Sequence, residues 1–136
     1  MRFMMMVKAD SRTEAGVLPT QQDLEAMGKY NQELIKAGVM LDGAGLQPSS
    51  KGARVAFPGG VPRVTDGPFV ETKELLAGYW LIQVTSKEEA IEWAKRIPFA
   101  QLPGDGRVPE VEVRQMFEDS DFAEVAPAAA DSRGHR

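Results

Sequence analysis

The chain has 136 residues, which is too short for two independent catalytic domains, so we expect one domain. Sixteen Lys and Arg against twenty Asp and Glu give a net charge of −4. This charge argues against direct nucleic-acid binding, because phosphate-binding proteins carry excess positive charge. The lack of cysteine excludes disulfides, thiol nucleophiles and thiolate metal sites. The apolar run at the N-terminus is too short for a signal peptide or a membrane span, so we expect a cytoplasmic protein without membrane contact.

The first third of the chain predicts a strand followed by a helix. Residues 2–8 are mostly apolar and predict a buried strand, whereas residues 9–19 are typical of a loop. Thr20, with Asp23 three positions later, predicts the N-terminus of a helix with apolar residues at helical spacing. Gly38 supplies the expected C-terminal stop.

The middle of the chain predicts a second strand and a hairpin. Residues 39–46 are apolar enough for a strand, although two glycines in it indicate a bulge or a close approach to the backbone. Residues 53–57 and 61–65 flank a Pro-Gly-Gly turn and predict a β-hairpin. Pro62 places the second of these strands at an edge, since proline cannot donate to a ladder.

The last third predicts a strand, a helix and a final strand. Residues 77–85 are rich in aromatic and β-branched side chains on both faces and predict a central strand. Ser86 and Glu89 form a predicted capping box for a helix that ends before Pro98. Residues 108–116 alternate between apolar and charged side chains, which predicts a strand with one wet face.

This order of elements predicts an α+β fold, namely a ferredoxin-like split βαβ arrangement with an inserted β-hairpin. Helices would then cover one face of the sheet only, and a second copy of the chain is the economical cover for the other face. We therefore expect a homodimer. The domain is expected over residues 1–117, followed by a mobile Ala- and Pro-rich tail over residues 118–136.

The densest group of polar residues lies between the hairpin and the central strand, in the segment 66–74, Asp-Gly-Pro-Phe-Val-Glu-Thr-Lys-Glu. One interpretation brings Asp66, Glu71, Thr72 and Lys73 together at the mouth of a pocket for acid/base chemistry. The other interpretation is that the segment only shapes a turn and its charges form a solvated face. Spacing alone leaves both open.

This segment resembles the signature of the DGPF proteins, a branch of the YCII-related family. Eight of nine positions agree, with Val70 where the signature has Ala. The similarity continues through residues 75–82 and 90–94 and covers residues 1–117. It implies a dimeric α+β barrel, in which two sheets pack face to face and each subunit holds a cleft.

The resemblance also implies a function, although in outline only. In the YciI-like branch, a His of the first helix and an Asp before a Pro-aromatic step are thought to act as a pair. This chain departs from that pattern, because its one histidine is His135 and Ile97 precedes the Pro-aromatic step. The implied function is a small-molecule-binding or enzymatic cleft protein of unknown reaction. The alternative is a non-enzymatic interaction or regulatory module associated with extracytoplasmic-function sigma factors.

On this basis we assign catalytic candidates to Asp66, Glu71 and Lys73, and substrate-binding candidates to Thr72, Tyr30 and Arg54. Tyr30 lies close to where the histidine of the YciI-like branch would fall, and it either presents a hydroxyl to the cleft or packs in the core. Arg54 either captures an anion or belongs to a solvated face. We predict no metal site and no cofactor, because the acidic residues are scattered.

Overall fold

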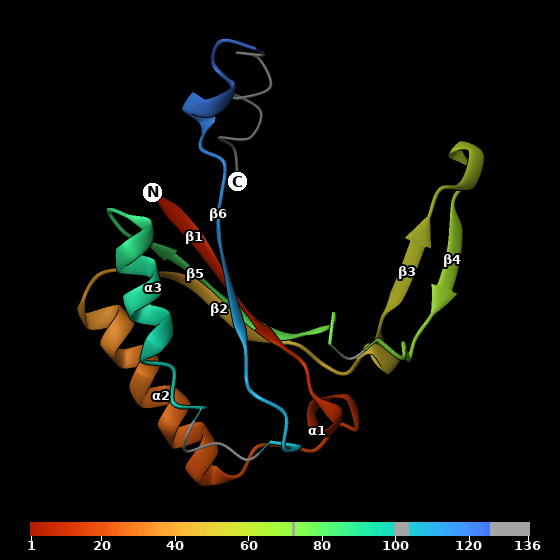
Figure 1. The fold of residues 1–136 in the computed structure, drawn as a ribbon, viewed down its shortest axis with the longest axis horizontal. Coiled ribbons are helices and arrows are strands. Elements are labelled where there is room, and N and C mark those ends of the chain that lie inside the picture. The colour runs from red at the N-terminus through yellow and green to blue at the C-terminus, as the bar shows by residue number, and fades with distance from the viewer. Residues whose placement is uncertain (72, 100–103, 126–136) are drawn as a thin grey trace.

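The computed structural model describes residues 1–71, 73–99 and 104–125 (Figure 1). Within them the chain forms a mixed α+β structure, as predicted. The α-helices are α1 (Ser11–Glu14), α2 (Gln21–Lys36) and α3 (Lys87–Lys95). The strands are β1 (Arg2–Lys8), β2 (Met40–Gly45), β3 (Ala53–Ala56), β4 (Arg63–Asp66), β5 (Leu76–Gln83) and β6 (Val111–Gln115).

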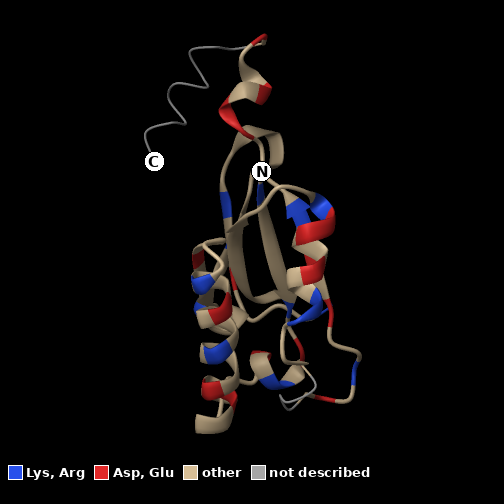
Figure 2. Cartoon of the chain, turned by 90° about the vertical axis from the view of Figure 1, so that its left-hand side faces the viewer, with Lys and Arg blue, Asp and Glu red and all other residues tan. Residues whose placement is uncertain are grey.

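Four of these strands form an antiparallel sheet in the order β2-β5-β1-β6. β5 has a neighbour on each side, which confirms the predicted central strand. α2 and α3 pack on one face of this sheet (Figure 1). Figure 2 shows charged residues on both helices, whereas the strands of the sheet are mostly uncharged. The largest fully buried side chains come from this layer: Phe3, Met5, Leu34 and Ile82. No helix in the described part of the chain is long and apolar enough to cross a bilayer.

The opposite face of the sheet is apolar in its centre. Because side chains alternate along a strand, Met4 and Met6 of β1 point away from α2 and α3. They pair with Leu81 and Tyr79 of β5, and all four side chains are half-buried. We refer to this surface as the open face.

The ends of α2 agree with the prediction from sequence. The Thr20 hydroxyl accepts a hydrogen bond from Asp23 N–H at 3.2 Å, and the Asp23 carboxylate accepts one from Thr20 N–H at 2.8 Å. At the other end Gly38 has a φ of +73°, and Val39 N–H donates to Leu34 O at 3.1 Å. Both ends are therefore closed by local hydrogen bonds that the sequence specifies.

Short helical elements lie where the sequence predicted no regular structure, among them α1, η1 (Ser49–Lys51) and a turn near the C-terminus. α1 falls within residues 9–19, and Asp10 caps it by accepting Thr13 N–H at 2.9 Å. A 3-10 helix, η4 (Asp119–Phe122), begins the segment predicted as a tail, and Glu118 N–H donates to the Asp121 carboxylate at 2.7 Å. Single turns made of polar residues have no apolar periodicity, so periodicity could not reveal them. Residues 126–136 of the predicted tail lie outside the described residues.

The predicted hairpin forms from β3 and β4 and projects away from the sheet (Figure 1). Val55 pairs with Val64, so both side chains point to the same face, and alternation adds Phe57 to it. These side chains are 52%, 63% and 64% exposed, respectively. Arg54 lies on the other face. The hairpin is thus amphipathic, with an apolar face that is largely exposed in the isolated chain.

Candidate functional site

A cleft of about 830 Å³ lies between α2 and the β2–β5 side of the sheet. Its floor contains three glycines, because Gly45 pairs with Gly78, and Gly43 pairs with Trp80 two positions along, on the same face of the sheet. A Cβ on Gly43 would lie 3.0 Å from the Trp80 ring, and one on Gly78 would lie 3.0 Å from the Ala44 carbonyl oxygen. A Cβ on Gly45 would meet nothing within 4 Å. The missing side chains therefore create depth at this end of the sheet.

The glycines of β2 carried a signal in the sequence. We expected either a bulge or a close approach to the backbone, and the pairing of β2 with β5 shifts register between Met40 and Asp42. This shift, which is a bulge or another irregularity, lies just before the first of the two glycines. The cleft above the same strand was not predicted as such.

The side wall of the cleft comes from α2. Leu24 and Met27 contribute apolar surface, and Asn31 stands beside them. The Asn31 side-chain oxygen accepts a hydrogen bond from Trp80 Nε1 at 2.8 Å, which fixes the indole ring at the floor. Exposed apolar residues, including Leu18, extend the lining to the rim. The result is a mostly apolar cavity of a size that suits a small organic molecule.

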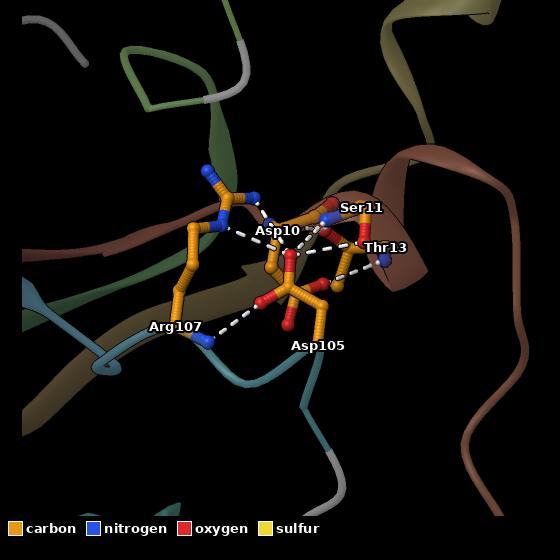
Figure 3. A network of polar contacts seen from close by, with 5 residues as sticks. All are labelled: Asp10, Ser11, Thr13, Asp105 and Arg107. Atoms are coloured by element: carbon orange, nitrogen blue, oxygen red, sulfur yellow. Dashed lines mark hydrogen bonds and ion pairs between the residues drawn. The ribbon is translucent and has the colours of Figure 1, made fainter.

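A polar network holds α1 at the border of the cleft (Figure 3). The Asp105 carboxylate accepts hydrogen bonds from Ser11 N–H at 2.8 Å, from the Ser11 hydroxyl at 2.9 Å and from Arg107 Nε at 2.9 Å. These donors, with the Arg107 side chain first, hold the pKa of Asp105 well below its usual range. The capping pair of Asp10 and Thr13 lies next to them. α1 is therefore fastened to the loop that leads into β6.

The turn of the 66–74 motif is fastened to the other end of α1. The Glu14 carboxylate accepts a hydrogen bond from Ser49 N–H at 2.9 Å, and the Ser49 hydroxyl accepts one from Phe69 N–H at 2.9 Å. Gly67 N–H donates to Gly52 O at 3.0 Å. A Cβ on Gly67 would overlap the Ser49 carbonyl oxygen. Glycine is therefore required here by close packing of two backbone segments.

Comparison with known proteins shows which family this chain belongs to. The model of the YCII-related domain matches residues 1–117. The chain belongs to the YCII-related family. It is also 36% identical over 74 residues to an uncharacterised protein of Rhizobium meliloti (strain 1021). That match covers 54% of this chain and 57% of the relative, so the chain spans little more than half of the relative's length. The predicted family is confirmed, whereas the DGPF branch stays a prediction.

In this YCII-related chain the predicted catalytic residues do not line the cleft. Glu71 forms an ion pair with Arg54 at 3.2 Å, and the Arg54 guanidinium lies 3.8 Å from the centre of the Phe69 ring. A hydrogen bond from its own backbone N–H, and then Arg54, hold the pKa of Glu71 below its usual value. Asp66 and Lys73 are exposed. The structure brings Arg54 and Glu71 together, and a catalytic role for Asp66, Glu71 and Lys73 stays a prediction.

The remaining predicted residues are placed as follows. Tyr30 is 3% exposed and its hydroxyl donates to Trp93 O at 2.7 Å, so it lies in the core of this family member and not at the cleft. Burial raises its pKa. Thr72 and His135 lie outside the described residues. Among the described residues, no three His, Asp and Glu side chains are grouped in a way that would hold a metal ion.

Sequence reasoning missed most residues that do line the cleft. Arg12 of α1, Asn31 of α2 and Gly78 of β5 are far apart in the chain, and only the fold brings them to one cavity. The one available signal near Arg12 was the pair Asp10 and Thr13, which has the spacing of a helix cap.

Proposed function

We propose that this protein binds a small organic molecule in the cleft between α2 and the β2–β5 side of the sheet. The observation that supports the proposal is the floor of Gly43, Gly45 and Gly78, which opens about 830 Å³ beside a fixed tryptophan ring. Ligand sites of this kind are concave, mostly apolar and lined by a few polar groups. No reaction is assigned, because Asp10 and Asp23 of the cleft lining serve as helix caps and Glu110 is exposed.

The proposal is tested by thermal unfolding of the full chain against a broad metabolite panel. A ligand at about a hundred times its Kd adds about 2.7 kcal/mol, which raises the Tm of a chain of this size by several degrees. The variant Gly45→Leu fills the cleft from a position where a Cβ meets open space, so it should remove the rise in Tm without a clash. The matched control is the double variant Asp66→Ala, Lys73→Ala, which should still show the rise in Tm with the ligand.

Two results would contradict the proposal. A ligand whose effect survives Gly45→Leu would bind elsewhere. A ligand whose effect is lost in the Asp66→Ala, Lys73→Ala variant, while Gly45→Leu keeps it, would move the site to the 66–74 motif and support the role predicted for those residues from sequence.

A homodimer is part of this proposal. The strand order β2-β5-β1-β6, with two helices on one face and a hairpin inserted between β2 and β5, supports the ferredoxin-like split arrangement. The open face, with Met4, Met6 and Leu81, suits the face-to-face packing of two sheets in a dimeric α+β barrel. Light scattering should give twice the mass of 14.9 kDa, and Leu81→Lys should yield monomers. A wild-type monomer would exclude the barrel.

One observation favours a second candidate function, a non-enzymatic interaction module. The hairpin presents Val55, Phe57 and Val64 on one largely exposed face, and two-stranded hairpins are marginally stable without such a face being covered. If the protein is a monomer and no member of the panel raises its Tm, a partner protein becomes the better explanation of this face.

A further inference from the structure

Three of the four side chains of α1 hold this helix in place. Ser11 binds the loop before β6, Thr13 completes the N-terminal cap, and Glu14 binds the loop before β3. The fourth side chain, Arg12, is half-buried and lines the cleft. The guanidinium thus belongs to a helical turn that is held in position at both ends. This reduces the conformational entropy lost when the guanidinium binds a ligand.

The other basic residues of the cleft are neutralised by neighbours. Lys8 forms an ion pair with Glu112 at 3.4 Å, and Arg107 forms one with Asp105 at 2.9 Å. Within the described part of the chain, Arg12 has no acidic partner in an ion pair. Its positive charge is therefore available to a ligand.

Asn31 and Arg12 offer hydrogen-bond donors to a ligand in the cleft, whose lining also includes the exposed Glu110. The Asp10 and Asp23 carboxylates already accept backbone N–H bonds at 2.9 and 2.8 Å. The oxygen of the Asn31 amide is occupied by Trp80 Nε1, which leaves its NH₂ group as a donor beside the floor. Together with the guanidinium of Arg12, these donors call for a ligand with acceptor oxygens and negative charge.

We infer that the cleft binds an organic monocarboxylate with an apolar or aromatic body, and that Arg12 binds the carboxylate. The inference rests on the proposed function and names its ligand class. The body would lie against Trp80 and the glycine floor, next to Met27. A single available guanidinium matches a single negative charge. A phosphate dianion fits less well, because its second charge would be repelled by the carboxylates of Asp10, Asp23 and Glu110, which line the same cavity.

The test uses phenylpropionate, its neutral amide phenylpropionamide, and phenyl phosphate as probes, with calorimetric titration of the full chain. Loss of a charge-assisted hydrogen bond weakens binding roughly ten- to a hundredfold, so the amide should bind that much more weakly than the acid. Arg12→Gln should lower the affinity for the acid to that for the amide, and Arg12→Lys should retain part of the difference in affinity. Arg63→Gln, on the exposed hairpin, is the matched control and should change nothing.

Each outcome decides the inference. Equal affinity of acid and amide, unchanged affinity in Arg12→Gln, no measurable binding at millimolar concentration, or tighter binding of phenyl phosphate would overturn it. If Gly45→Leu abolishes binding of both acid and amide while they bind equally to the wild type, the cleft proposal stands and only the carboxylate inference fails. If Gly45→Leu affects neither, both fail.

Discussion

Replacing Gly67 by Ala should release the 66–74 turn from the body of the protein. The added Cβ would overlap the Ser49 carbonyl oxygen and lie 2.6 Å from its carbonyl carbon. The two backbone segments must therefore separate, which breaks the bonds from Gly67 N–H to Gly52 and from Phe69 N–H to Ser49. Overpacking costs about 1–3 kcal/mol and each of the two neutral hydrogen bonds about 1 kcal/mol, so we expect a loss of about 3–5 kcal/mol.

The matched control is Gly52→Ala in the facing loop. A Cβ on Gly52 would lie 3.6 Å from the same Ser49 oxygen, which is an ordinary contact. Its φ of −123° suits any residue, so this variant should be neutral or slightly stabilising. Urea unfolding gives the global free energy, and hydrogen exchange at the Phe69 amide detects a local opening of the hairpin base. If Gly67→Ala stays within about 1 kcal/mol of Gly52→Ala and the Phe69 amide keeps its protection, the close packing argument is wrong.

Two further predictions concern stability. Tyr30→Phe removes the hydroxyl that donates to the Trp93 carbonyl in the core, and should cost about 1–2 kcal/mol in urea unfolding. A cost near zero would show that water or another donor replaces the hydroxyl. The folded-state pKa of Asp105 lies below its unfolded value of about 3.9, so its stabilisation is present above that pH and is lost as the pH falls through the folded pKa. The Tm of Asp105→Asn should therefore lie below that of the wild type at pH 7, and the difference should shrink below about pH 4. A difference that does not change with pH would contradict this assignment.

Local signals explain why the main elements could be predicted from sequence. The capping pair of Thr20 and Asp23, the stop at Gly38 and the alternation along β6 act within a few residues, and the structure uses each of them. At Ser86 the signal was half right. Ser86 caps α3 as expected, but the Glu89 carboxylate accepts its hydrogen bonds from Thr85.

The site could not be predicted in the same way, because it depends on contacts between distant segments. Gly45 and Gly78 meet only when β2 pairs with β5, and nothing in their own neighbourhoods indicates a shared floor. The density of charge in the 66–74 motif was the basis for predicting catalytic residues there. In the structure its backbone is fixed by Ser49, and its Glu71 is paired with Arg54, so much of its polarity serves to position the hairpin.

The three glycines of the cleft floor differ in how large a side chain each position tolerates. This difference bears on how the sequences of related proteins are interpreted. Gly45 has room for a side chain, Gly43 has room only if Trp80 moves, and Gly78 has backbone in the way. If the cleft binds a ligand as proposed, a homologue can change the size of molecule it admits by substituting one edge-strand position while its core stays intact. Two relatives with the same charged motif but different residues at that position should be expected to differ in ligand.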